Sequence, residues 1–395
     1  MSIITVLAVI CSLGAAPAAA THTSAGADAV RFWNEVTVST VTGAAIPIPE
    51  QPLYLTYVHR AVYDGVLRAN ARHASSVAAA TAAAHAVLVH YFPAQQATLD
   101  QRYADALAAV PDDRARRAGL AAGLAAAGKL LRERAGDGLN GPTKPAPPTG
   151  PGVWVPTPPN TMGVSSWLDG VRPFALRSAA QFRPGAPPSL NSRTWARAYD
   201  ETRVLGSATS TARTAAQTET ARFWSEPPYV QNQKTLRALT RDRGMSAART
   251  AQLFALADSA SADALIACWD AKYHYVFWRP FSAIPAGDTD GNPATRPDPA
   301  WTPLLATPNH PEYPSAHGCA TSALFGVVAG LLGTHRIDVT LEAAVTGTSH
   351  HFATLEQLIR EMGNARVWGG LHWRFSTETG VRLGEQVARV VLSDR

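Results

Sequence analysis

Apolar residues recur at helical spacing along most of the chain, and proline or glycine separates the successive runs. The alanine-rich stretch 78–90 favours a helix, and 99–133 predicts two helices separated at Pro111, because proline breaks a helix interior. Three further helical stretches are predicted, over 193–224, 246–278 and 320–332. No strand-rich region or internal repeat is visible in the sequence. The pattern therefore predicts an all-α fold, a helical bundle with a site between its helices.

Two long segments lack helical periodicity. Residues 138–159 are rich in Pro and Gly and form either a domain linker or a covering loop; we favour the loop, because one continuous domain is expected around it. Residues 285–308 form a second loop. Its Asp288, Asp290 and Asn292 offer oxygen ligands for calcium, but the twelve-residue spacing and the bidentate Glu are missing, so a plain turn is predicted.

The composition is that of a large folded protein. With 395 residues, 46% hydrophobic and 16% charged, the chain is long and apolar enough to bury a sizeable core. The net charge is +5 and the pI about 9.2, which indicates a mildly basic surface. No Lys/Arg block is interleaved with aromatic residues, so no nucleic-acid partner is expected.

The first twenty residues resemble an export signal. Residues 3–16 are apolar and uncharged, and the alanines at 18–20 provide small residues before a cleavage site. We therefore predict a signal peptide, residues 1–20, and a secreted mature chain; a retained anchor is the alternative. The run 320–332 is too short for a membrane span, so no stable span is expected after signal removal.

The mature chain, 21–395, is predicted to be a single domain with its catalytic motifs within 269–376. Cys11 leaves with the signal peptide. Cys268 and Cys319 each lie next to a motif described below, and they are either two free, buried thiols or, since export permits it, a disulfide.

The first motif is Lys272 followed seven positions later by Arg279 and then by proline. Seven residues are nearly two helical turns, so both cations can project from one helix face, together with Trp269 and Val276. The alternative is an amphipathic helix edge whose cations extend to water. The mostly apolar and aromatic flanks make two idle cations less expected there.

The second motif is Pro314-Ser315-Ala316-His317, followed by an apolar run. Proline before such a run predicts the first turn of a helix, where unpaired backbone N–H groups and the helix dipole favour an anion. Ser315 adds a hydroxyl, and His317 is placed to exchange a proton. The alternative is an ordinary capped helix with a surface histidine.

The third motif is Arg366 followed by His372, with Gly369-Gly370 between them. Six positions do not return to one face of a regular helix, but the glycines can bend the chain so that the two side chains converge. The alternative is a core helix broken by glycine. Together the three motifs supply three cations, two imidazoles, a hydroxyl and a helix N-terminus, which suits a tetrahedral oxyanion.

This set resembles the signature of the superfamily of type 2 phosphatidic acid phosphatases and vanadium-dependent haloperoxidases, and its soluble haloperoxidase-type branch in particular. The superfamily pattern is Lys, six residues, Arg-Pro; then Pro-Ser-Gly-His; then Ser-Arg, five residues, His, three residues, Asp. The first motif matches fully. The others depart from the pattern at Ala316 for Gly, Ala365 for Ser and Ser376 for Asp.

The resemblance implies the superfamily's all-α helical bundle, with vanadate or phosphate bound in its core. It implies that Lys272, Arg279 and Arg366 neutralise the anion's oxygens, with hydrogen bonds from Ser315 and the N–H of Ala316. His317 would be the general acid–base, and His372 would bond vanadium or attack phosphorus. Trp269 and His310 would line the pocket, His310 at a position where that branch carries Phe or His.

The function we predict is a vanadium-dependent haloperoxidase, with vanadate as cofactor and hydrogen peroxide and halide as substrates. The missing Asp at position 376 favours this, because a phosphohistidine needs a supporting carboxylate more than a vanadate ligand does. One alternative is a secreted acid phosphatase or phosphoesterase acting through a phosphohistidine. The other is a non-catalytic phosphate- or vanadate-binding protein, which loss of both histidines would have favoured. No oligomeric state is predicted.

Overall fold

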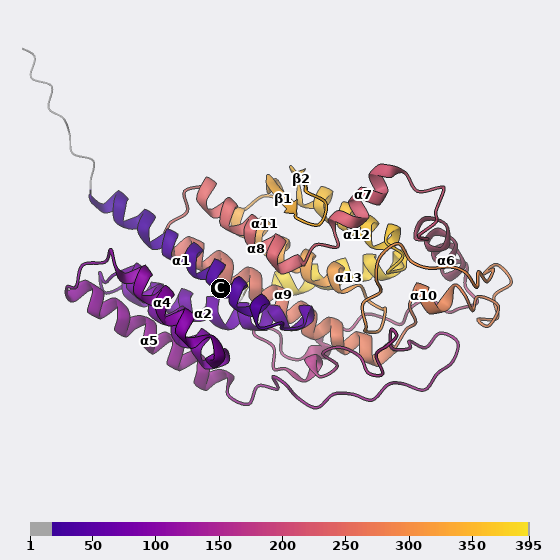
Figure 1. Cartoon of the computed structure of the whole chain (residues 1–395), viewed down its shortest axis with the longest axis horizontal. Coiled ribbons are helices and arrows are strands. Elements are labelled where there is room, and N and C mark those ends of the chain that lie inside the picture. The colour runs from indigo at the N-terminus through magenta and orange to yellow at the C-terminus, as the bar shows by residue number, and fades with distance from the viewer. Residues whose placement is uncertain (1–17, 394–395) are drawn as a thin grey trace, which may run out of the picture.

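The structure is a computed structural model and describes residues 18–393 of the chain, with side chains from Ser24 on. Its α-helices are α1 (Ala18–Gly43), α2 (Gln51–Asn70), α3 (Ser76–Tyr91), α4 (Gln96–Leu107), α5 (Arg114–Arg134), α6 (Arg193–Leu205), α7 (Ala215–Phe223), α8 (Pro228–Asp242), α9 (Ala247–Tyr275), α10 (Pro280–Ala283), α11 (Ala316–Leu332), α12 (Leu355–Trp368) and α13 (Arg374–Ser393) (Figure 1). Short 3-10 helices are η1 (Ile48–Glu50), η2 (Pro93–Gln95), η3 (Leu168–Gly170) and η4 (Ala179–Phe182). The strands are β1 (Val339–Ala343) and β2 (Thr348–Phe352). The predicted all-α fold is confirmed.

The central element is α9, which runs through the middle of the molecule in Figure 1, between α1–α5 at one end and α6, α7 and α10 at the other. It packs against α1, α2, α11 and α13, and most of its side chains are buried. By length and composition α9 is long and apolar enough to cross a membrane, and so is the bent pair α3–α4 taken together. Because 89% of its apolar window is buried in the protein, α9 has the character of a core helix. The expected absence of a span stays a prediction.

Close helix contacts in the N-terminal half depend on glycine. A side chain at Gly123 of α5 would collide with the carbonyl oxygen of Ala79 on α3, and one at Gly119 would collide with that of Ser75. The alanines of α3 are almost completely buried against this face. The small residues therefore let α3 and α5 approach backbone to backbone, which explains why the alanine-rich stretch is a core helix.

A buried polar network joins α1, α2, α8 and α9. His59 Nδ1 lies 2.5 Å from Asp258 Oδ2, and Asp258 Oδ1 accepts a hydrogen bond from Gln233 Nε2 at 2.5 Å. Asn34 Nδ2 donates to Gln233 Oε1 at 2.6 Å and lies 3.3 Å from His59 Nε2. Since each group has a partner, the network fixes α8 against α9, and these two helices form part of the cavity described below.

The C-terminal half is built around the pair α11 and α13, which also pack closely through glycine. A side chain at Gly384 of α13 would collide with the Cys319 carbonyl, and one at Gly380 would lie 2.5 Å from the Ser315 carbonyl oxygen. This contact lies at the N-terminus of α11. It brings the second motif against the segment that follows the third.

The hairpin of β1 and β2 is absent from the sequence-based prediction. The strands pair antiparallel, with Val339 opposite Phe352 and Ala343 opposite Thr348. In β1 buried and exposed residues alternate, which is the strand pattern, and Gly347 adopts a left-handed conformation in the turn. The alternating pattern of β1 is only five residues long and lies between the helical patterns of α11 and α12, so it is not distinguished in the sequence.

The two predicted loops are confirmed, and both are packed. In the first, Trp154 N–H donates to the carbonyl of Val276 at 2.7 Å, so this loop covers the end of α9. In the second, Asp290 accepts hydrogen bonds from Trp195 Nε1 at 2.7 Å and from Thr295 Oγ1 at 2.8 Å. Asp290 is therefore a turn residue with its oxygens engaged by protein donors. Within residues 18–393 no group of His, Cys, Asp or Glu has metal-ligand geometry.

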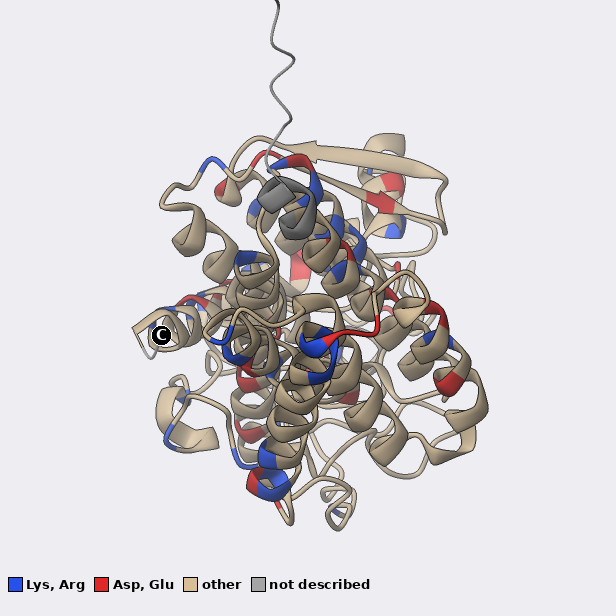
Figure 2. Ribbon diagram, turned by 90° about the vertical axis from the view of Figure 1, so that its left-hand side faces the viewer, with Lys and Arg blue, Asp and Glu red and all other residues tan. Residues whose placement is uncertain are grey.

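Charged residues of both signs are interspersed over the helices seen in Figure 2, where neither Lys and Arg nor Asp and Glu form a continuous block. The net charge of +5 is therefore spread over the chain. The predicted signal peptide, residues 1–20, lies outside the described residues except for the first three of α1, so cleavage and secretion stay predictions.

Candidate oxyanion site

The first motif does not lie on one helix face, so that prediction is wrong. The last residue of α9 is Tyr275, and Val276 caps the helix in a left-handed conformation with φ of 44°. Arg279 is extended and lies at the N-terminus of the short α10. Lys272 and Arg279 are nevertheless both completely buried, and the turn brings Arg279 back toward the motifs that follow.

Lys272 holds the chain that leads into α11. Its Nζ donates to the backbone carbonyls of Pro311, Glu312 and Pro314 at 2.7, 2.9 and 2.6 Å. An ammonium has three protons, so each is used. Lys272 therefore fixes the segment before α11 and contributes its charge to the site from behind the wall of the cavity.

Arg279 links the other motifs. Its Nε donates to the carbonyl of His310 at 3.0 Å, and its Nη1 donates to the carbonyl of Leu371 at 2.9 Å. Nη1 also lies 3.3 Å from His372 Nε2, and Nη2 lies 2.9 Å from His310 Nδ1. The guanidinium thus stands between the two imidazoles and fixes the backbone on either side.

The second motif forms the N-terminus of α11. Ser315 is the N-cap, with its Oγ accepting from Gly318 N–H at 3.4 Å, and Pro314 lies just before the first turn rather than in it. The first intrahelical bond to this cap is donated by Cys319 N–H. The N–H groups of Ala316 and His317 precede it, so they have no acceptor within the helix. The predicted helix N-terminus is confirmed.

The third motif converges as predicted. After α12, Gly370 adopts a left-handed conformation with φ of 73°, and the N–H groups of Leu371 and His372 return to the carbonyl of Arg366 at 3.1 and 3.3 Å. A side chain at Gly370 would lie 2.5 Å from the Gly206 carbonyl oxygen, so glycine is required there. Arg366 Nη1 donates to the carbonyl of Trp224 at 3.0 Å, whereas its buried Nε has no hydrogen-bond partner.

A residue that the sequence analysis missed supports His372. Glu312, completely buried, places Oε1 2.7 Å from His372 Nδ1, and the same oxygen accepts from Trp373 N–H at 3.0 Å. Ser376, where the superfamily has Asp, contacts the backbone oxygen of Glu312 through its hydroxyl at 3.5 Å. His372 therefore has a carboxylate partner, which corrects the expectation that it lacks one. The available signal was a lone Glu three residues before Ser315.

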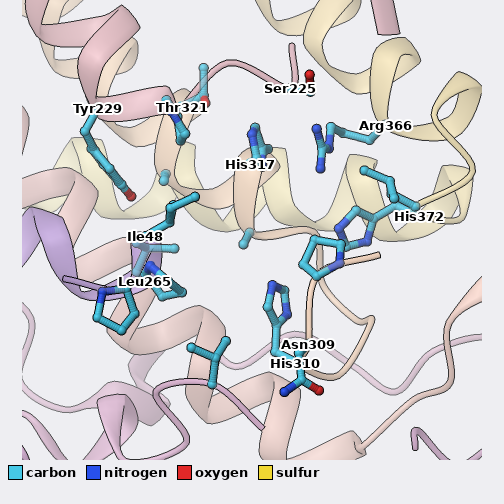
Figure 3. A pocket seen from close by; sticks show the side chains of 18 of the residues that line it. Ile48, Ser225, Tyr229, Leu265, Asn309, His310, His317, Thr321, Arg366 and His372 are labelled. Atoms are coloured by element: carbon cyan, nitrogen blue, oxygen red, sulfur yellow. The ribbon is translucent and has the colours of Figure 1, made fainter. Parts of the chain in front are cut away.

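These groups meet at one end of a cavity of about 720 Å³ (Figure 3). His317, Arg366 and His372 point into it, and Ala316, His310 and Trp269 also line it. Lys272, Arg279 and Ser315 are completely buried behind this wall. All nine predicted site residues thus lie in one region, in two layers: six line the cavity and three lie behind them.

Burial lowers the pKa values of these cations, and for Lys272 and Arg279 the carboxylate of Glu312 opposes the shift only in part. Burial and repulsion from Arg279 lower the pKa of Arg366 to about 9. Burial also lowers the pKa of Lys272 to about 8 and that of Arg279 to about 10. The carboxyl of Glu312 has its pKa raised to about 7 by burial, against the opposing effect of Arg279 and Lys272.

The histidines respond to the same environment. Burial, followed by repulsion from Arg366, lowers the pKa of His317 well below its ordinary value. The pKa values of His310 and His372 are lowered for the same reasons, burial first and then Lys272 for His310 and Arg279 for His372. Three cations facing one carboxylate leave an excess of positive charge in a buried region.

A tetrahedral oxyanion fits this region. The unpartnered Arg366 Nε is a buried donor at the cavity, and the first N–H groups of α11 are donors of the same kind. An anion with several oxygens would satisfy these donors and offset the excess positive charge. Vanadate and phosphate both have this form, so the residues present suit either group.

The two cysteines lie together as free thiols. Cys268 and Cys319 are both free and buried, and each thiol acts on the pKa of the other. Cys268 Sγ also contacts the carbonyl oxygen of Pro314 at 3.6 Å. The disulfide alternative is therefore not formed in this structure.

Comparisons with known proteins point to one group of enzymes. The family described as the VCPO second helical-bundle domain matches residues 252–394. The vanadium chloroperoxidase of Curvularia inaequalis is 28% identical over 307 residues, which are 58% of this chain and 50% of that protein. This chain thus spans about half the length of that relative.

Solved structures share the fold over nearly the whole chain. One, described as the first bacterial vanadium-dependent iodoperoxidase, has a TM-score of 0.75 at 23% identity and covers 95% of this chain and 96% of its own. Another, a holo-type bacterial vanadium-dependent chloroperoxidase, has a TM-score of 0.72 at 17% identity and covers 88% and 91%. The helical arrangement is therefore that of these proteins.

Proposed function

We propose that this chain, which belongs to the superfamily of type 2 phosphatidic acid phosphatases and vanadium-dependent haloperoxidases, is a vanadium-dependent haloperoxidase that uses hydrogen peroxide to oxidise halide. The observation that carries the proposal is the meeting of His317, Arg366 and His372 at one end of a cavity, above the N-terminus of α11. The relatives named as chloroperoxidase and iodoperoxidase support it.

The vanadate would be held by groups from both layers. Arg366 and the N–H groups at the start of α11 would hydrogen-bond its oxygens, while Lys272 and Arg279 would contribute positive charge from behind. Bound vanadate supplies Lewis-acid activation of the peroxide, so no redox-active side chain is needed.

The contact with Glu312 determines how His372 presents its ring. Above about pH 7, where the Glu312 carboxyl is ionised, Nδ1–H donates to Oε1, so the proton is held on Nδ1 and Nε2 keeps its lone pair. Nε2 then accepts from Arg279 Nη1 at 3.3 Å, and it would exchange this contact for the bond to vanadium. His317, across the cavity on α11, is placed to accept and return the proton of the peroxide.

A second candidate is a phosphatase acting through a phosphohistidine on His372, and the same carboxylate favours it. The absence of Asp at position 376 was the argument against this reaction, and Glu312 at 2.7 Å removes that argument. The site chemistry alone is compatible with both reactions. The names of the relatives decide our preference for the peroxidase.

The test compares the two activities on one preparation. Purified protein is treated with vanadate and assayed for bromination of a phenol dye with peroxide, beside hydrolysis of an aryl phosphate. We expect vanadate-dependent bromination in the wild type and none in His372→Ala, with His351→Ala as the matched control on the exposed face of β2. Efficient ester hydrolysis that vanadate only inhibits would overturn the peroxidase assignment.

We also propose that the mature protein is secreted, on the basis of the apolar segment before the alanines at 18–20. The measurement is the intact mass of the protein recovered from the culture medium of its producing cells. A mass corresponding to a chain beginning at residue 21 is expected. Recovery of the full-length chain from the membrane fraction would favour the anchor instead.

A further inference from the structure

The cavity is much larger than the proposed reagents require. A water molecule occupies about 30 Å³ of liquid, so an oxyanion, a peroxide and a halide would fill a small part of 720 Å³. Cavities of about 300–1,000 Å³ bind whole organic molecules. The remaining volume therefore has room for a further ligand beside the oxyanion end.

This remaining volume has a different lining. Figure 3 shows Ile48, Leu265 and Tyr229 on the side of the cavity away from Arg366 and His372. We define the apolar arm as the part lined by Ile48, Val164, Pro228, Tyr229, Leu265 and Ala320. Three helices supply it, α8, α9 and α11, with η1 at its edge. Small residues such as Ala320 keep the space open along α11 on the way to His317.

Two polar side chains beside the apolar arm lack partners. Asn232, on α8 one turn after Pro228, is 3% exposed, and its Oδ1 accepts no hydrogen bond. The Nε1–H of Trp269, on α9 one turn after Leu265, is completely buried and donates none. Both residues line the cavity. A buried polar atom without a partner is unfavourable, so a ligand that hydrogen-bonds to either atom gains binding free energy.

The apolar arm reaches the surface at Ile48, whose side chain is 48% exposed and lines the cavity. Among the described residues, Ile48, Met162 and Val345 are three of the five large hydrophobic side chains that are substantially exposed. Ile48 lines the cavity itself. The Met162 carbonyl accepts from Asn309 and the Val345 N–H donates to Glu226, and both of those residues line the cavity. An exposed apolar side chain on the cavity wall, with two more on residues whose backbones bond to lining residues, favours an apolar ligand.

We propose that the apolar arm binds an uncharged, mainly hydrocarbon molecule that carries a hydroxyl or N–H donor and an electron-rich ring or double bond, and that this molecule is halogenated while bound. The inference rests on the proposed peroxidase function. The donor would reach Asn232, and the reactive carbon would face the oxyanion end.

The reaction balances with reagents already named. Hydrogen peroxide accepts two electrons from the halide, and the resulting electrophilic halogen replaces a hydrogen on carbon. One proton is consumed and two waters form for each carbon–halogen bond made. The C–H proton leaves to solvent or to His317 at the oxyanion end of the cavity.

Binding is tested first, in the absence of vanadate and peroxide, by calorimetry with three probes: 4-butylphenol, phenol and butylbenzene. We expect 4-butylphenol to bind roughly tenfold or more tightly than phenol, because the butyl chain is buried in the apolar arm. Ile48→Asp should weaken 4-butylphenol binding about tenfold. The matched control is Leu124→Asp, at a leucine on α5 that is 56% exposed against 48% for Ile48, and it should bind like the wild type.

The role of Asn232 is tested by Asn232→Leu, which keeps the size and removes the acceptor. The wild type should prefer 4-butylphenol over butylbenzene by about tenfold, the usual worth of a buried hydrogen bond. The variant should lose this preference, and its affinity for butylbenzene should equal that of the wild type. Equal affinity of the wild type for all three probes, or equal losses in Ile48→Asp and Leu124→Asp, would overturn the apolar arm as a binding site.

Turnover gives the second readout. 4-Butylphenol and a water-soluble bromine acceptor compete in one vial, with vanadate, peroxide and bromide, beside a vial that receives hypobromite alone. Bound halogenation predicts a product ratio shifted at least tenfold toward 4-butylphenol, and a shift back in Ile48→Asp. If the wild type and Ile48→Asp both give the product ratio measured with hypobromite alone, halogenation occurs in solution and not in the apolar arm. Absence of any bromination would instead contradict the peroxidase proposal, and the calorimetry would still decide the site.

Discussion

At the scale of single residues, the most informative contact is that between Glu312 and His372. The superfamily pattern places the supporting carboxylate four positions after the histidine, where this chain has Ser376. Here the carboxylate comes from a segment sixty residues earlier, held in place by Lys272. The lone Glu before Ser315 is visible in the sequence, but its pairing with His372 depends on the tertiary contact between the second and third motifs.

The carboxylate that supports His372 can be moved from position 312 to position 376 by mutation. Glu312→Gln removes the charge beside His372 at nearly constant shape, and we expect vanadate affinity to fall about 10–100-fold, as for other carboxylates that support a metal-ligating histidine. Adding Ser376→Asp to that variant should restore much of the affinity, whereas Ser376→Asp alone should not raise it. The measurement is a vanadate binding isotherm for each of the three proteins. Glu312→Gln with wild-type affinity would show that the charge has no role.

Two arginines of the site differ in what else they do. Arg366 lines the cavity and leaves Nε free, so Arg366→Ala should weaken binding of phosphate or vanadate by about 1.5–3 kcal/mol. Arg279 donates to two backbone carbonyls, so Arg279→Ala should also lower the free energy of unfolding. Calorimetry and denaturant unfolding measure the two effects, with the exposed Arg241→Ala as control. Unchanged anion affinity in both site variants would mean that these cations are structural.

At the scale of helices and strands, the fold depends on close glycine contacts that one substitution can test. Gly123→Ala adds a methyl against the Ala79 carbonyl on α3, and we expect a loss of about 1–3 kcal/mol in the free energy of unfolding. Gly128→Ala, five residues later in the same helix, meets only the flexible end of Arg132 and should be neutral or stabilising by up to about 1 kcal/mol. Equal effects in the two variants would show that the helix contact is loose.

Most helices were predictable because apolar periodicity and proline positions are local signals. The breaks around Pro111 and at Gly369-Gly370 occur where the sequence indicates. The end of α9 was not predictable, since it is capped by Val276 in a left-handed conformation that β-branched residues rarely adopt. Tertiary contacts with the loop at Trp154 stabilise that turn, and a sequence pattern does not contain them.

At the scale of the whole molecule, the two ends of the cavity come from different parts of the chain. The oxyanion end is built by residues after α9 begins, whereas the apolar arm also requires Ile48 of η1 and Tyr229 of α8. The three motifs could be found by their spacing. The apolar arm could not, because its residues are scattered apolar positions that resemble any core. The chemistry is therefore encoded locally, and the proposed choice of organic ligand is encoded by the packing of distant helices.

The buried cations also determine how the stability of the whole protein responds to pH. The pKa of Lys272 falls from its ordinary 10.5 to about 8 on folding, so the folded state binds fewer protons than the unfolded state between these values. The ligand-free protein bears the full cost of the buried charge below pH 8. The free energy of unfolding of the ligand-free protein therefore rises as the pH increases from about 8 toward 10.5, because Lys272 loses its buried charge.

An oxyanion should reverse this dependence, because it binds the charged form of the site. Sulfate, whose charge is constant over this range, should raise the melting temperature most below pH 8. The increase should shrink as Lys272 loses its proton near pH 8. Thermal unfolding with and without sulfate at several pH values measures it, with an equal ionic strength of chloride as the control. A sulfate effect that stays constant to pH 10 would place the binding site away from these cations.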